Sequence, residues 1–218
     1  MDAAWDMVAA ERLALVDDLD RMTAEQWLVP SALPGWQVRH VVAHLLWPLE
    51  TSLPRMLWRV ARCGFRVLGA CDAAAESDVR AGPELSRALR AHARDPRFRP
   101  PGCGIEVPLT EVTVHALDIR VPLGIPFAVP AEHARIALDL LVSRRSPRGF
   151  TPPHLVDGLR FQAEDLGWAR GEGPEVSGPA DALLLSITGR PALLDRLRGD
   201  GVPAFRGRLR PPDSGTRS

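Results

Sequence analysis

The chain has 218 residues, 45% of them hydrophobic and 25% charged, which is ordinary for a globular protein of one large or two small domains. Its 27 basic and 27 acidic residues cancel, so the overall charge gives no reason to expect a nucleic acid or an anionic membrane as a partner. Every basic residue is Arg, and Lys, Asn and Tyr are absent, which suggests a high-GC genome.

The cysteines and the N-terminus indicate the compartment. Cys63, Cys71 and Cys103 are odd in number and have no C-x-x-C spacing, so they predict neither a disulfide framework nor a thiolate zinc site. The N-terminal stretch is acidic where a signal peptide is basic, and no apolar run reaches the roughly 18–20 residues of a membrane span. We therefore expect a reduced, cytoplasmic protein with no membrane partner.

The first part of the chain is predicted to be helical. Residues 3–22 alternate apolar and polar positions at helical spacing, which indicates an amphipathic helix. Thr23 followed by Gln26 matches a capping box and predicts a short helical turn that ends near Leu28.

A second helix is predicted from Gln37 to about Leu49, after a Pro-Gly turn. Its continuation towards Val67 has less support, because Pro48 and Pro54 must kink or break it. The run from 41 to 49 is apolar except for His44, and a helix that is hydrophobic on nearly all sides is buried on nearly all sides. His44 is therefore expected in the interior, where its ring needs a partner.

Further helices follow a weaker stretch. Residues 84–93 predict a short polar helix, and the Pro- and Gly-rich residues 95–104 predict a loop. Thr110 or the preceding proline then begins a helix that ends near residues 121–124, and a proline opens another over 131–143. The simplest packing of these helices is a four-helix bundle with extra turns.

The composition changes to Arg, Ser, Pro and Gly over residues 145–154, which suggests a linker between domains. The remainder predicts a small β-β-α-β unit, with strands at 155–164, 168–176 and 202–209 and helices at 179–187 and 191–197. We expect an α+β protein with a helical bundle over 1–148, a small α+β domain over 149–210 and a disordered tail over 211–218.

One pair of residues suggests a metal site. Glu111 and His115 are four residues apart, which on a helix places both side chains on one face. His44 supplies a third ligand from a second helix, giving the His2Glu set of an open zinc site. Asp118 is a ligand, an acceptor that orients His115, or a solvated charge, and we prefer the orienting role. The alternative to a metal site is a surface Glu111–His115 pair with His44 bonded to a backbone carbonyl.

Other reactive residues give weaker signals. The sequence has no Gly-x-Ser-x-Gly elbow, phosphate loop or dinucleotide fingerprint, and no acid or base signature beside a cysteine. The remaining histidines are expected on a helix face (His40) or exposed in polar segments (His92, His133 and His154).

Four segments carry a family resemblance. The segments are 33–45 (Leu-Pro-Gly-Trp-Gln-Val-Arg-His-Val-Val-Ala-His-Leu), 107–124 (Val-Pro-Leu-Thr-Glu-Val-Thr-Val-His-Ala-Leu-Asp-Ile-Arg-Val-Pro-Leu-Gly), 155–168 and 183–192. They resemble the mycothiol-dependent maleylpyruvate isomerase family of the DinB-like superfamily. The resemblance implies a DinB-like four-helix bundle, a sterol-carrier-like C-terminal unit, and a divalent metal, usually zinc, bound by His44, Glu111 and His115. Residues 50–100 have no clear match.

The resemblance also implies chemistry. A metal-bound thiol deprotonates, so mycothiol on the open position would be the nucleophile of an isomerase or thiol transferase acting on a small, possibly dicarboxylate, electrophile. Arg120 and Arg190 are the candidates for binding substrate carboxylates. The alternatives are a non-catalytic metal- or ligand-binding protein of the same fold, and a zinc-water hydrolase with Asp118 as base. We expect a monomer or homodimer whose partners are the small-molecule substrate and the thiol.

Overall fold

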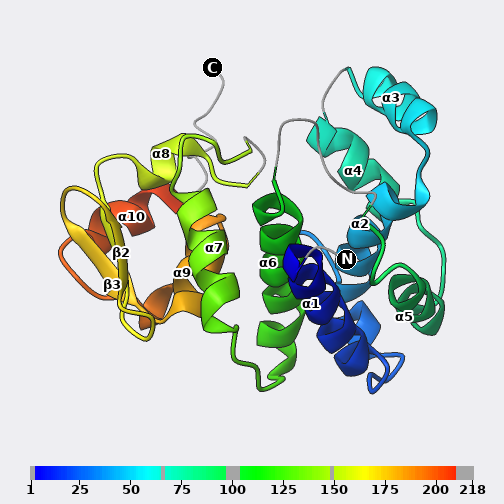
Figure 1. The fold of residues 1–218 in the computed structure, drawn as a ribbon, viewed down its shortest axis with the longest axis horizontal. Helices are drawn as coiled ribbons and strands as arrows, with labels where there is room; N and C mark the ends of the chain where they lie inside the picture. The colour runs from blue at the N-terminus through cyan, green and yellow to red at the C-terminus, as the bar shows by residue number, and fades with distance from the viewer. Residues whose placement is uncertain (1–2, 65–66, 97–103, 148–149, 210–218) are drawn as a thin grey trace, which may run out of the picture. The chain divides into compact units, whose positions relative to one another are not determined.

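We describe the protein from a computed structural model that covers residues 3–64, 67–96, 104–147 and 150–209 (Figure 1). The chain divides into two compact units, residues 1–127 and 128–218. The first is helical, and the second combines helices with a small sheet, so the predicted α+β class is confirmed. The predicted tail from Pro211 lies outside the described residues.

The first unit contains α1 (Ala3–Leu19), the 3-10 turn η1 (Gln26–Leu28), α2 (Val38–Glu50), α3 (Leu53–Arg62), α4 (Val67–Glu76), α5 (Gly82–Ala91) and α6 (Glu106–Leu123). Helices α1, α2, α5 and α6 pack around a shared core, because α1 contacts α5 and α6, and α2 contacts the same two helices. That core includes Leu15, Leu46, Leu89 and Ile119, one from each of the four helices. Helix α6 is buried along most of its length, which is why its polar residues need partners inside the unit.

The stretch after α2 is broken into separate helices near the two prolines that were expected to kink or break it. Helix α2 accommodates Pro48 but ends at Glu50, and α3 begins after Ser52 with Pro54 in its first turn. A proline is tolerated there because the first-turn N–H has no helical acceptor. Helix α4, which packs on α2, was not predicted from the sequence.

The second unit contains α7 (Ala131–Leu141), α8 (Pro153–Val156), β1 (Arg160–Ala163), β2 (Trp168–Gly171), β3 (Glu175–Gly178), α9 (Ala180–Ile187), η2 (Leu194–Arg196) and α10 (Val202–Leu209). The strand order is β2-β1-β3, with β1 antiparallel to β2 and parallel to β3. Helix α9 packs on β1, β3 and α7. Helix α7 therefore belongs with this unit, although the sequence placed the boundary after it, near residue 148.

Two strand predictions were wrong. Residues 202–209 form helix α10, whose buried Phe205 packs its ring against Phe161 of β1 at 5.4 Å between centroids. The expected strand over 168–176 is two strands, β2 and β3, separated by a turn in which Gly171 and Gly173 have φ of +85° and +121°. Positive φ values of this kind favour glycine, so these two residues end one strand and let the chain start another.

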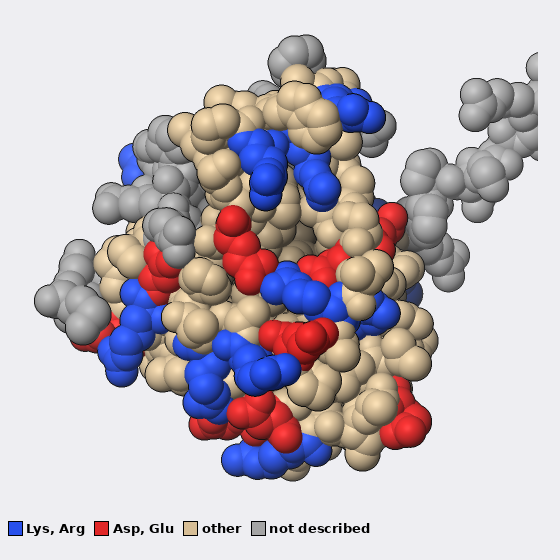
Figure 2. Space-filling view, turned by 90° about the vertical axis from the view of Figure 1, so that its right-hand side faces the viewer, with Lys and Arg blue, Asp and Glu red and all other residues tan. Residues whose placement is uncertain are grey.

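Surface charge on the first unit is mixed. Arginine side chains and acidic side chains lie interleaved on the face shown in Figure 2, in keeping with the net charge of zero. Within the described residues, no helix is both long and apolar enough to cross a membrane.

Candidate metal centre

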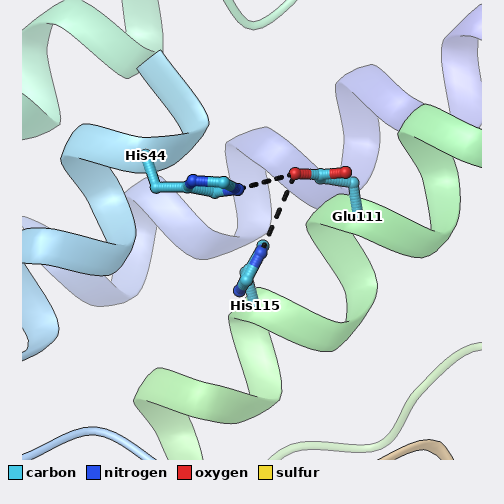
Figure 3. Close-up of side chains that lie close together, drawn as sticks. All are labelled: His44, Glu111 and His115. Carbon is cyan, nitrogen blue, oxygen red and sulfur yellow. Dashed lines mark hydrogen bonds and ion pairs between the residues drawn. The ribbon is translucent and has the colours of Figure 1, made fainter. Parts of the chain in front are cut away.

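Three side chains from two helices converge inside the first unit. His44 points from α2 towards α6, where Glu111 and His115 project from successive turns (Figure 3). The helical spacing of four residues puts Glu111 and His115 on one face of α6, and the packing of α2 on α6 brings His44 opposite them. Each residue offers one ligand atom, and the three atoms lie within 4.8 Å of one another.

The distances suit a small divalent cation. His44 Nε2 lies 2.8 Å from Glu111 Oε1, and His115 Nε2 lies 3.8 Å from the same oxygen. Tetrahedral zinc with bonds of roughly 2.0–2.2 Å separates its ligand atoms by about 3.3 Å, a value between these two distances. The residues present therefore fit a divalent ion after small side-chain adjustments. Two histidines and one carboxylate would leave a fourth tetrahedral position for another group.

Asp118 orients His115. The carboxylate of Asp118, on the next turn of α6, lies with Oδ2 2.9 Å from His115 Nδ1, and its side chain is fully buried. Nδ1–H of His115 therefore donates to Asp118. The lone pair on Nε2 of His115 is then directed at Glu111 and His44. Carboxylate–histidine pairs of this kind fix the tautomer and raise the basicity of a metal-ligating imidazole.

Burial favours the neutral form of His115. Removal from water lowers the pKa of His115 below its ordinary value, the hydrogen bond to Asp118 opposes this, and the charge of His44 adds to the lowering. A neutral imidazole with a free Nε2 lone pair is the form that binds metals. Burial and the hydrogen bond to Asp118 thus keep His115 in the form of the imidazole that can bind a metal.

His44 is held differently. Its ring contacts the rings of Trp36 and His115 edge to face, at centroid distances of 5.3 and 4.9 Å. Its buried Nδ1 makes no hydrogen bond to any part of the chain that the structure describes. The hydrogen bond between Nε2 and Glu111 at 2.8 Å and the packing against the two rings therefore fix the orientation of His44.

The two arginines predicted for substrate binding are not brought to the cluster within the first unit. Arg120 lies on the opposite side of α6 from Glu111, because nine residues at 100° each amount to half a turn beyond two full turns. Its Nε donates to Asp18 Oδ2 at 2.7 Å, and its guanidinium stacks on Phe127 at 3.5 Å from the ring centroid. Arg190 belongs to the second unit, where its Nη1 donates to the Thr188 carbonyl at 2.6 Å.

A third arginine near the cluster was missed. Arg12 of α1 is buried, and it lines a small cavity together with Glu111 and five apolar residues (Leu45, Pro48, Leu89, Pro108 and Val112). The sequence held a signal for it, since residue 12 falls at helical spacing between the buried positions Val8, Leu15 and Leu19. A charged side chain in the apolar stripe of a helix is buried, so it needs partners inside the protein.

The other histidines have structural contacts. His40 caps the start of α2, where its Nδ1 accepts from the Gln37 N–H at 3.2 Å. His92 is half-buried beside Asp95, and His133 is buried, which corrects the expectation that both are exposed. His154 is exposed as expected.

Comparisons with known proteins identify the family. The family model for the mycothiol maleylpyruvate isomerase N-terminal domain matches residues 8–120, more than half of the chain, including His44, Glu111 and His115. The fold is similar to two crystal structures, one of a mycothiol-dependent maleylpyruvate isomerase and one of a histidine-to-alanine mutant of that enzyme. Each has a TM-score of 0.59 and 13% identity, covering 91% of this chain and 92% of the other. No curated protein matches. The chain belongs to the mycothiol maleylpyruvate isomerase N-terminal domain family.

Proposed function

We propose that this protein is a metal-dependent enzyme that uses mycothiol to isomerise, or to transfer a thiol to, a small electrophile. The observation that carries the proposal is the cluster of His44, Glu111 and His115, with Asp118 behind His115. The family match and the fold shared with a mycothiol-dependent maleylpyruvate isomerase support it. Zinc is the metal expected for two imidazoles and one carboxylate. We place the protein in the cytoplasm, because its cysteines indicate a reducing compartment.

The residues divide the work between them. His44, Glu111 and His115 would hold the ion, and Asp118 keeps the proton on Nδ1 of His115 so that Nε2 remains a ligand. A bound zinc ion would lower the pKa of a thiol placed on its open position and so supply a nucleophile at neutral pH. Apolar neighbours of the cluster, among them Leu45 and Val112, exclude water from this side of it.

An external thiol is needed because the chain's own thiol beside the site is unreactive. Burial, with added repulsion from the Glu111 charge, raises the pKa of the Cys71 thiol to about 12. Cys71 therefore stays protonated at neutral pH and is a poor nucleophile. In an isomerisation, addition of an external thiolate to one alkene carbon would break the π bond, and rotation and loss of the same thiolate would restore it, leaving the thiol unchanged.

Two other functions were considered from the sequence. A hydrolase with Asp118 as general base finds no support in the geometry, because Asp118 is fully buried and its carboxylate already accepts from His115. A non-catalytic binding protein of the same fold has the same three residues, so experiment must separate it from an enzyme. Arg190 remains our candidate for binding a substrate carboxylate.

Cobalt substitution tests the proposal. The protein is loaded with Co²⁺ in place of zinc and titrated with mycothiol while the near-ultraviolet and visible spectra are recorded. We expect a thiolate-to-cobalt charge-transfer band that saturates, and conversion of a cis-alkene substrate to the trans isomer that requires both metal and thiol. The Glu111→Gln protein should show neither. A cobalt spectrum unaffected by mycothiol would indicate a binding protein, and turnover without any thiol would indicate a hydrolase.

A further inference from the structure

Helix α3 presents an apolar face to solvent. Leu53, Leu57 and Trp58 are 66, 60 and 58% exposed, and no residue of this helix is buried. Together with the exposed Pro54 and Ala61 they span an arc of about 140°, because successive residues of a helix are roughly 100° apart. Single apolar residues are ordinary on a protein surface, but a continuous apolar patch on one side of a helix marks a binding surface.

The apolar face is not used for packing among the described parts of the first unit. Helix α3 lies beyond α4 and away from the core that α1, α2, α5 and α6 share (Figure 1). It contacts α4, and Met56 and Cys63, on the other side of the helix from the apolar face, are half-buried. The helix is therefore attached to the unit through one side, which leaves its apolar side available to a partner.

Three arginines border the apolar face. Arg55, Arg59 and Arg62 lie three and four residues apart on α3, which contains no acidic residue. Their side chains form no hydrogen bond or ion pair with the described residues, and Arg62 stacks on Trp58 at 4.7 Å from the ring centroid. The upper part of the face in Figure 2, which carries α3, shows arginine and uncharged side chains without acidic ones among the described residues. The helix thus carries unbalanced positive charge, although the whole chain sums to zero.

We propose that α3 binds reversibly to the surface of a membrane that contains anionic lipids. Helices with Trp and Leu on one face and arginines beside it lie in the plane of the headgroups, with the apolar side chains at the acyl boundary. Each arginine near a negatively charged leaflet adds to the attraction. The expectation of no membrane partner rested on the net charge of the chain, whereas a lipid surface attracts the local charge of α3. The inference is independent of the proposed function, because α3 contributes no residue to the metal cluster.

Two other partners fit α3 less well. A second copy of the chain docked through the same face would bring the arginines of two α3 helices together, with no acidic residue on either helix to balance them. A nucleic acid is bound through arginines that neutralise its phosphates, whereas here Leu and Trp side chains occupy the outward face. A lipid surface is the partner that uses both the apolar face and the arginines.

Co-sedimentation of the full-length protein with vesicles tests the proposal. We expect binding at low salt to vesicles of equal parts phosphatidylglycerol and phosphatidylcholine, little binding to phosphatidylcholine alone, and weaker binding as salt is added. Leu57→Ser should lose about tenfold or more in affinity for the anionic vesicles through the apolar area that it removes. The combined Arg55→Gln, Arg59→Gln and Arg62→Gln variant should lose about tenfold or more through its charge. Leu28→Ser is the matched control, because Leu28 is 53% exposed but lies outside α3, and it should bind like the wild type.

Tryptophan fluorescence reports whether α3 itself enters the lipid. The emission of the wild type should shift to shorter wavelength with anionic vesicles, and Trp58→Phe should still bind them but lose most of that shift. All the substituted side chains are exposed or half-buried, so the variants should keep the circular dichroism of the wild type. A wild type that does not bind the anionic vesicles at low salt, or binding that is unchanged in Leu57→Ser, overturns the inference. A wild-type dimer that Leu57→Ser converts to a monomer, without vesicle binding, would assign the face to a second copy of the chain instead.

Discussion

Two arginines are buried in the same helical unit, and their partners differ. Arg120 is 2% exposed and forms an ion pair with Asp18 at 2.7 Å while stacking on Phe127. Arg12 is almost as buried, yet its Nη1 donates to three neutral main-chain carbonyls, and the charges of Asp95 and Glu111 also act on it. One guanidinium is held by an ion pair, whereas the other is held by carbonyls and lies near Glu111.

The difference separates two kinds of buried charge. Arg120 and Asp18 join α6 to α1 through an ion pair, although Nη1 of Arg120 is buried without a hydrogen-bond partner among the described residues. Arg12, on the same helix as Asp18, joins α1 to the segment after α5 and lines a small cavity together with Glu111. Along α6, Arg120 marks the part of the unit held by an ion pair, which we call the structural end, and Glu111 marks the part with the metal cluster, which we call the site end. His115 and Asp118 lie between these two residues. Each substitution below changes a residue at or between these two ends, and the measurement reports stability or zinc affinity.

The largest effect is expected at the structural end. Arg120→Met should lower the free energy of unfolding by about 3 kcal/mol, because it removes the 2.7 Å ion pair and leaves Asp18, whose side chain is only 16% exposed, with just the exposed Arg21 at 3.5 Å. Urea denaturation monitored by circular dichroism measures this change. Zinc affinity should be unchanged, because Arg120 lies on the opposite side of α6 from Glu111. A variant that is as stable as the wild type would mean that the ion pair with Asp18 does not stabilise the unit.

A somewhat smaller effect is expected between the two ends. Asp118→Asn keeps the shape of the side chain but removes the anionic acceptor of His115 Nδ1–H, so zinc affinity should fall about 10- to 100-fold. Competition with a chromophoric chelator measures the affinity. Asp17→Asn, at an exposed carboxylate that pairs with Arg90, is the matched control and should not change it. Equal affinities in wild type and Asp118→Asn would mean that Asp118 does not support the ligand.

The most modest effect concerns pH. The pKa of His115 in the folded protein is below the ordinary histidine value of about 6.5, mainly through burial. As the pH falls through about 6.5, the unfolded chain therefore gains a proton that the folded protein does not, and the metal-free protein loses stability. Above that pH the histidine is neutral in both states and contributes nothing. Urea denaturation at several pH values should show a shallower loss on acidification for His115→Gln. A wild type that becomes more stable below pH 6.5 would contradict the buried neutral histidine.

Sequence reasoning reached the site better than it reached the fold. Glu111 and His115 could be paired from helical spacing alone, and His44 stood out as the one polar residue in an apolar run. Residue types alone suggested that these three residues form one ligand set, with a surface pair and a core histidine as the alternative, and the resemblance then favoured the ligand set. Spacing could not decide this, because His44 and Glu111 are 67 residues apart in sequence. Asp118 followed because the same spacing placed it behind His115.

The failures have physical causes. Residues 202–209 alternate enough to suggest a strand, but Phe205 is the buried anchor of a helix that packs on Phe161, and periodicity over eight residues does not separate the two. Helix α7 was predicted as part of the helical bundle but packs on α9, since an amphipathic pattern shows that a face is buried but not against which element. Arg12 was missed although it falls at helical spacing among buried positions of α1, and its partners, main-chain carbonyls, could not be predicted from the sequence.

The central claim is that His44, Glu111 and His115 hold one divalent metal ion. The most direct measurement is the metal content of the purified, chelator-treated and zinc-reconstituted protein, by elemental analysis after gel filtration. We predict one equivalent of zinc per wild-type chain, and loss of that zinc in His44→Ala, Glu111→Gln and His115→Ala, each folded by circular dichroism. A wild type without stoichiometric zinc, or a His115→Ala protein that retains it undiminished, would contradict the account.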